Sequence, residues 1–116
     1  MIIIHQITLT EDQIAAVNHG TTVPAFEAKI SVQLQGSDGF KVENFKFYKE
    51  TVSVDTDDLD VAFEATNLWN MSEITKKFSN TVYSSSVGDI FQKGDRYFMV
   101  NNFGFQELYF FADELN

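Results

Sequence analysis

The sequence contains no cysteine, a single proline and 8 basic residues against 17 acidic ones. The absence of cysteine excludes a disulfide framework, a thiolate zinc site and a cysteine nucleophile. The formal net charge of −9 argues against general affinity for nucleic acid or an anionic membrane, because both favour clustered Lys and Arg. No apolar run approaches a membrane span, and the first residues lack the basic segment of a signal peptide. We therefore expect a cytosolic protein without membrane contact.

The composition that remains is typical of a folded domain. The chain has 116 residues, of which 44% are hydrophobic and 15% aromatic, including 12 Phe. This length accommodates one hydrophobic core and is too short for two domains. Because no repeat, low-complexity run or linker interrupts the chain, we predict a single domain over residues 1–116.

The first half of the chain predicts one strand followed by two helices. Residues 2–9 are apolar and β-branched, which is typical of a strand. Thr10 and Gln13 have the spacing of a capping box at the start of a short helix. Pro24 suits the first turn of a second helix, where a missing N–H costs nothing. On the inner face of that helix we place three apolar residues: Phe26, Ile30 and Leu34.

The second half predicts a strand, two helices and then further strands. Residues 45–54 alternate like a strand, residues 56–68 form the clearest helix, and residues 72–78 predict a shorter one. From residue 86 onward the pattern is that of strands, with a hairpin turn at residues 93–95. The fold class is therefore predicted as α+β, with short helices packed on a small antiparallel sheet and a C-terminal β-hairpin or meander.

The helix at residues 56–68 is the first candidate site, because residues 50–75 contain seven acids and no base. At 100° per residue, three of these acids fall within a stripe about 60° wide, opposite an apolar side that faces the core. Two aliphatic residues lie next to the stripe. We predict that this mixed acidic and aliphatic surface binds a partner protein through Asp57, Asp60, Val61, Glu64 and Leu68. The core side consists of Leu59, Ala62, Phe63 and Thr66.

Other interpretations of the acidic helix stay open. Acids at residues 57 and 58 favour a helix N-terminus, each by about 0.3–1 kcal/mol, and the remaining acids can form an ordinary solvated face. The stripe can also mimic a phosphate backbone and occupy a basic DNA-binding cleft. A cation site is the remaining alternative, but its EF-hand form is excluded, because Asp60 stands where that loop needs Gly and Thr66 stands where it needs Glu.

The aromatic C-terminus is the second candidate site. Eight of the 21 residues from 91 to 111 are Phe or Tyr, and aromatic side chains on a sheet can stack on single-stranded nucleic acid. A small regulatory domain that contacts nucleic acid in this way is the alternative function. Only Lys93 and Arg96 supply nearby positive charge, so a role in the sheet core is favoured. The consecutive aromatic residues 109–111 face both ways, which allows a partner or a second copy of the chain on one side.

The sequence contains few of the residue patterns that known catalytic sites require. His5 and His19 lack metal-ligand spacing, the serines at 84–86 lie outside a G-x-S-x-G context, and no glycine-rich phosphate-binding loop is present. We therefore predict no catalytic residue, no metal and no cofactor, and a protein that is not an enzyme. A metal-dependent or carboxylate-based enzyme is the third hypothesis.

Two stretches together resemble a known group of proteins. The first runs from residue 54 to residue 67, and the second contains S-V-G-D at residues 86–89 and G-F-x-E-L at residues 104–108. This combination resembles the YodL-like group of small proteins carried by bacteriophages and plasmids. The resemblance implies a setting rather than an activity: a phage or plasmid product in a bacterial cytoplasm. Together with the acidic helix it predicts a non-enzymatic factor that binds a host protein, including an inhibitor or DNA mimic.

The S-V-G-D signature also has a physical interpretation. Ser86 and Asp89 can hydrogen-bond to backbone N–H groups in the turn that enters a strand, and Gly88 can adopt a positive φ. Gly104 is predicted to turn the chain so that the rings of Phe103 and Phe105 both enter the core.

Overall fold

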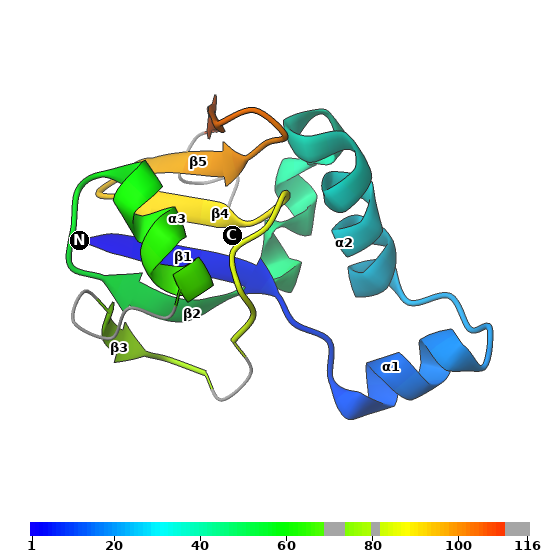
Figure 1. Ribbon diagram of the computed structural model, residues 1–116. Helices are drawn as coiled ribbons and strands as arrows, with labels where there is room; N and C mark the ends of the chain where they lie inside the picture. The colour runs from blue at the N-terminus through cyan, green and yellow to red at the C-terminus, as the bar shows by residue number, and fades with distance from the viewer. Residues whose placement is uncertain (69–73, 80–81, 111–116) are drawn as a thin grey trace.

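The computed structural model describes residues 1–68, 74–79 and 82–110. Over these ranges, the strands are β1 (Ile2–Ile7), β2 (Tyr48–Val54), β3 (Ile74–Lys77), β4 (Ile90–Lys93), β5 (Arg96–Val100) and β6 (Phe105–Leu108). The α-helices are α1 (Glu11–Asn18), α2 (Pro24–Gln35) and α3 (Leu59–Leu68), and two 3₁₀ helices are η1 (Gly36–Gly39) and η2 (Val42–Phe47) (Figure 1). The predicted α+β class is confirmed. In the part of the chain described, no helix is long and apolar enough to cross a membrane.

The strands form one antiparallel sheet in the order β3-β2-β1-β4-β5-β6. Strand β1 lies in its interior, where Ile2 pairs with Val54 of β2 on one side and with Lys93 of β4 on the other. Strands from the beginning, the middle and the end of the chain therefore share one sheet. The β-branched run at residues 2–7 fits an interior strand because both of its faces are covered.

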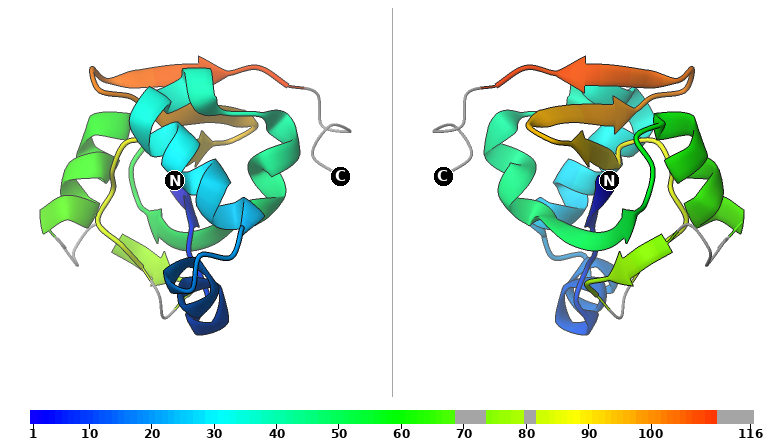
Figure 2. Two further views of the ribbon diagram at one scale, coloured as in Figure 1. Left: turned by 90° about the vertical axis from the view of Figure 1, so that its right-hand side faces the viewer. Right: turned by 90° about the vertical axis from the view of Figure 1, so that its left-hand side faces the viewer.

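Helices cover both faces of the sheet, α3 on one and α2 with η2 on the other (Figure 2). Consecutive Ile90 and Phe91 are both fully buried, because they point to opposite faces. The core under α3 contains Ile2, Ile4, Val52, Val54, Ala62, Ala65, Ile74, Phe91 and Val100. The core under α2 contains Ile7, Val23, Ala25, Ala28, Val32, Tyr48, Ile90 and Met99.

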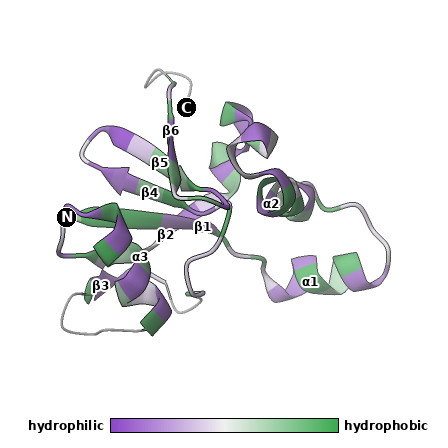
Figure 3. Ribbon diagram, turned by 45° about the horizontal axis from the view of Figure 1, so that its top comes forward, coloured by the Kyte–Doolittle hydropathy of each residue, from purple (hydrophilic) through white to green (hydrophobic). Residues whose placement is uncertain are grey.

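Several local signals in the sequence give the predicted structure. The Thr10 side chain accepts from the backbone N–H of Gln13, whose side chain accepts from the backbone N–H of Thr10, so the capping box of α1 is confirmed. Pro24 occupies the first turn of α2. The hairpin between β4 and β5 turns at Gly94, whose φ is +62°. Helix α1 itself stands away from the sheet, and none of its residues is buried (Figure 3).

The predicted inner face of α2 is wrong. The buried residues of this helix are Ala25, Ala28 and Val32, whereas Leu34 is 74% exposed. Small side chains allow a helix to approach a sheet closely, so the helix turns its alanine stripe inward. Phe26 only packs against the edge of this core.

Three predicted elements differ from the structure in type or in length. The strand expected over residues 45–54 begins only at Tyr48, because residues 42–47 form η2, in which the Phe45 ring stacks on Tyr48 with centroids 5.9 Å apart. The helix expected over residues 72–78 is wrong as well: residues 74–77 are β3, held by pairing with β2. Residues 72 and 73 lie outside the described ranges. The strand expected at residues 87–91 begins at Ile90, after a turn at residues 87–88.

Gly88 occupies a position that combines a positive φ with tight packing. Its φ is +97°, and a methyl group added to it would lie 2.6 Å from Cγ2 of Val32. Gly94 also has a positive φ, but nothing lies within 4 Å of an added methyl group. Substitutions at the two glycines therefore distinguish the cost of a positive φ from the cost of steric crowding.

We expect Gly88→Ala to destabilise the protein more than Gly94→Ala. The positive φ costs both variants about 1–2 kcal/mol, and overpacking against α2 adds about 1–3 kcal/mol to Gly88→Ala alone. Urea denaturation of both variants and the wild type measures the difference in free energy of unfolding. Equal losses in the two variants would contradict the close packing of residue 88 on α2.

Candidate functional site

Helix α3 is positioned by a cap at its start and by small residues on its inner side. The Asp58 carboxylate accepts from the backbone N–H groups of Asp60, at 2.9 Å, and Val61, at 3.2 Å. The helix therefore begins at Leu59, three residues later than predicted. The predicted core side is confirmed, because Ala62 and Thr66 are buried while Leu59 and Phe63 pack against the core. The opposite side of α3 faces outward.

The outward side of α3 brings together three of the five predicted partner-binding residues. Asp60, Glu64 and Leu68 follow one another at intervals of four, and all three are exposed, with Leu68 at 71%. Val61 is only half-exposed. Asp57 precedes the helix and lies 2.9 Å from the N-terminal ammonium of Met1, which lowers the pKa of the Asp57 carboxyl. Within the described ranges, no basic side chain pairs with Asp60 or Glu64.

The turn between β5 and β6, which lies next to the start of α3, carries an exposed aromatic residue. Phe105 packs inward, with its ring centroid 5.2 Å from that of Phe91, but Phe103 is 99% exposed. The prediction that both rings enter the core is thus wrong for Phe103, because Gly104, at φ +80°, reverses the chain between them. Asp60 shares a surface hollow of about 220 Å³ with Asn101, Asn102 and Gly104 of this turn. We name the surface formed by Asp60, Glu64, Leu68 and Phe103 the α3–turn surface.

Near the C-terminus, Tyr97 and Phe110 are half-buried and pack against each other and against Phe45. The rings of Tyr97 and Phe110 lie 5.1 Å apart, and Phe45 meets Tyr97 edge-on at 5.6 Å, on the α2 side of the sheet. Arg96, one of the two bases near these rings, forms an ion pair of 2.6 Å with Glu107. Tyr109 stays exposed at 83%, and Phe111 lies outside the described residues. This packing fits the core role favoured by the sequence.

The two histidines differ in environment. His5 is buried, its Nε2 lies 2.8 Å from Oε1 of Gln92, and its ring packs 5.4 Å from that of Phe45. Burial lowers the pKa of His5, so the ring is kept neutral inside the core. His19 ends α1 on the surface. In the described part of the chain, no group of three His, Asp or Glu side chains is placed to hold a metal ion.

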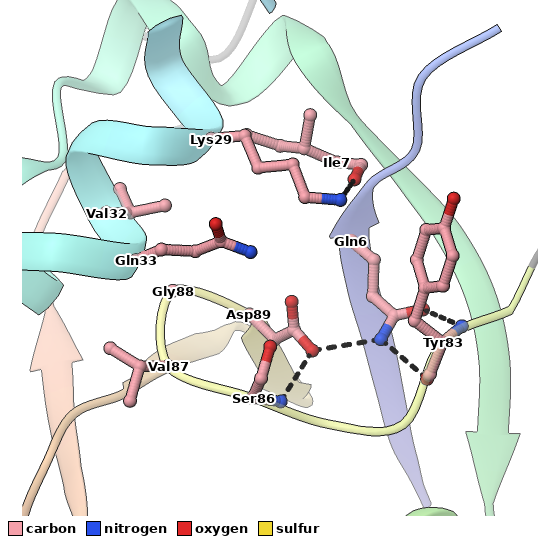
Figure 4. Close-up of a pocket in the computed structure, with 10 residues that line it drawn as sticks. All are labelled: Gln6, Ile7, Lys29, Val32, Gln33, Tyr83, Ser86, Val87, Gly88 and Asp89. Atoms are coloured by element: carbon pink, nitrogen blue, oxygen red, sulfur yellow. Dashed lines mark hydrogen bonds between the residues drawn. The ribbon is translucent and has the colours of Figure 1, made fainter. Parts of the chain in front are cut away.

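The S-V-G-D turn forms one wall of a cavity at the end of β1 (Figure 4). As predicted for this turn, Oδ2 of Asp89 accepts from the backbone N–H of Ser86 at 3.1 Å. It also accepts from Nε2 of Gln6 at 2.9 Å. The Gln6 amide additionally bonds both backbone groups of Tyr83, which joins this segment to the interior strand. Ser85 is held by Thr66 of α3 at 2.6 Å.

Lys29 of α2 enters the same cavity from the opposite side. Its Nζ donates to the backbone carbonyl of Ile7 at 3.0 Å and lies 4.6 Å from the ring centroid of Tyr83. Burial lowers the pKa of Lys29, and burial raises the pKa of Asp89 to about 7. The cavity has a volume of about 210 Å³. Its lining consists of Gln6, Ile7, Lys29, Val32, Gln33, Tyr83, Ser86, Val87, Gly88 and Asp89.

The sequence did not indicate this cavity as a binding site, because Gln6, Lys29 and Asp89 come from three distant segments. The one local signal in the sequence is the S-V-G-D pattern, which predicts a turn and does not by itself indicate a ligand site. Comparison of the chain with protein-family models, with curated proteins and with solved structures finds no match. Function must therefore be argued from the α3–turn surface and from the cavity.

Replacing Asp89 by Asn should change the pH dependence of stability. Because the pKa of Asp89 is raised to about 7 in the folded state, the folded protein binds the extra proton between about pH 4 and pH 7. The free energy of unfolding of the wild type therefore falls through this group as the pH rises over that interval, because the folded state holds a proton that the unfolded state has released. Asn keeps an acceptor oxygen for Gln6 and Ser86 but carries no charge. The variant should gain stability relative to the wild type from pH 4 to pH 8.

Urea denaturation of the two proteins across this pH range measures the effect. The lowered pKa of His5 acts oppositely, since it removes stability as the pH falls below 6.5, but it is common to both proteins and cancels in their difference. The Lys29 ammonium and the Tyr48 hydroxyl, which donates to the carbonyl of Gly88 at 2.6 Å, are likewise present in both. A difference in stability that stays constant with pH would show that Asp89 titrates normally.

Proposed function

We propose that this protein is a non-enzymatic interaction factor that binds another protein through the α3–turn surface. The observation that carries the proposal is the position of Phe103. Its ring is almost fully exposed on a turn that borders the acidic helix. An aromatic ring in water forgoes the burial of roughly 150–250 Å² that such side chains achieve in cores and interfaces.

The chemistry of the surface defines the partner. Asp60 and Glu64 have no basic partner among the described residues, so their charge is free to attract a positive surface. Phe103 and Leu68 supply the apolar area that determines how long a complex lasts, while the carboxylates speed and orient the encounter. The partner should therefore carry an apolar pocket bordered by Lys or Arg. A DNA-binding protein whose cleft accepts the acids in place of phosphates fits this description.

The sequence resemblance supports the cellular setting of the proposal. Residues 54–108, which resemble the YodL-like group, include both α3 and the turn that carries Phe103. A phage or plasmid product in a bacterial cytoplasm would meet host proteins there, so we propose a host protein as the partner. The packing of Tyr97 and Phe110 against Phe45 disfavours the alternative, in which aromatic residues of the C-terminal sheet stack on nucleic acid.

Two variants of the α3–turn surface should lose binding. Phe103→Ala removes the aromatic anchor, and because such anchors contribute about 2 kcal/mol or more, affinity should fall at least about tenfold, mainly through faster dissociation. Asp60→Lys combined with Glu64→Lys should abolish binding, and the wild-type affinity should fall steeply with salt. The measurement is capture from a bacterial lysate, followed by surface plasmon resonance with the purified partner at two salt concentrations.

The matched control combines Glu27→Lys with Glu43→Lys. Both residues are exposed on the α2 side of the sheet, and this variant makes the same change in net charge. It should capture the partner as the wild type does. If every variant captured the same protein, the binding site would lie outside α3. If neither the wild type nor any variant captured a protein, the acidic residues would be an ordinary solvated face without a partner. A gel shift by single-stranded DNA at low salt would favour the nucleic-acid alternative.

A further inference from the structure

The cavity at the end of β1 holds two groups of opposite charge that attract each other without forming a direct ion pair. Lys29 and Asp89 both line it, yet no ion pair within 4.0 Å joins these two described residues. Each is fixed by other groups: Asp89 by Gln6 and Ser86, Lys29 by the carbonyl of Ile7 and the ring of Tyr83. The protein thus holds a carboxyl group and an ammonium group apart at fixed positions.

Each charged group keeps hydrogen-bonding capacity for a ligand. Oδ2 of Asp89 accepts both of its hydrogen bonds, and Oδ1 accepts none from the described residues and faces the cavity (Figure 4). An ammonium group has three donors, of which Lys29 uses one on Ile7. The amide of Gln33 points into the same space from α2 (Figure 4). A ligand that fits needs a donor for Asp89 and, a short distance away, an acceptor for Lys29.

We propose that this cavity binds a small zwitterion, a free α-amino acid. The ligand's ammonium group donates to Oδ1 of Asp89, and its carboxylate accepts from Nζ of Lys29. A cavity of about 210 Å³ holds a molecule of this size. The apolar part of the lining comes from Tyr83, Val32, Ile7 and Val87. The Gln33 amide, which points into the same space, contacts the ligand side chain.

Charge complementarity favours this class over singly charged ligands. A ligand with only an amine would bring a second positive charge close to Lys29. A ligand with only a carboxylate would bring a second negative charge close to Asp89. An α-amino acid neutralises both groups in one binding event, and charge-assisted hydrogen bonds are stronger than neutral ones. Because ammonium binding favours the ionised carboxylate and Asp89 has a pKa of about 7, complex formation near neutral pH should release a proton from Asp89 to the buffer.

The test is a titration of ¹⁵N-labelled protein with each standard α-amino acid at millimolar concentration, followed by NMR. Ethylamine and propionate serve as ligands that carry only one of the two charges. We expect at least one amino acid to shift the amide signals of residues 83–89. Asp89→Asn and Lys29→Gln should each weaken its binding at least about tenfold. Asp89→Asn keeps the bonds to Gln6 and Ser86, so it tests the charge and not the fold.

Three results would overturn the proposal. The first is that no amino acid shifts these signals in the folded wild type. The second is equal affinity in the wild type and in both variants. The third is binding of ethylamine or propionate as tight as that of the amino acid. Calorimetry in buffers of different ionisation enthalpy gives an independent measurement, because proton release should occur with the wild type and disappear with Asp89→Asn.

Discussion

Strand β1 is hydrogen-bonded along both edges, and the remaining structure is arranged around it. Its residues pair with residues 48–54 on one side and with residues 90–93 on the other, so two segments far apart in sequence meet on the first strand. Alternate side chains of β1 enter the two cores, Ile2 and Ile4 under α3 and Ile7 under α2. Neither core is complete without this strand, and neither helix has a surface to cover without it.

This arrangement determines where function can lie. Because helices cover both faces of the sheet, the surfaces open to ligands are the outer sides of helices, the turns between strands and the strand ends. The α3–turn surface combines the first two, and its exposed carboxylates need little support because water solvates them. The cavity lies at the end of β1, where a buried carboxylate requires support, which Gln6 and Ser86 supply. The two sites therefore suit different ligands, a protein surface and a small molecule.

Local signals in the sequence predicted the elements that local interactions stabilise. The capping box at Thr10, the turn at Gly94 and the buried side of α3 all follow from spacing within a few residues. Elements decided by distant partners were missed. Residues 74–77 form a strand because β2 supplies hydrogen bonds, and Leu34 is exposed because alanines allow α2 to pack closely. The exposure of Phe103 depends on the direction of a turn, and the cavity depends on three segments that only the folded chain brings together.

The hydrogen bonds of the S-V-G-D turn do not require a charged side chain at residue 89. The turn needs one acceptor oxygen for the backbone N–H of Ser86 and the amide of Gln6, and an asparagine would supply that oxygen without placing a charge in the cavity. Burial opposes the charge and raises the pKa of Asp89 to about 7, so the ionised form costs stability at neutral pH. Ionisable groups whose pKa values are strongly shifted by burial are concentrated at functional sites, where the charge takes part in binding or catalysis. Since Oδ2 performs the structural role and Lys29 attracts Asp89 without a direct ion pair, the open Oδ1 side is left to accept a hydrogen bond from a ligand of opposite charge.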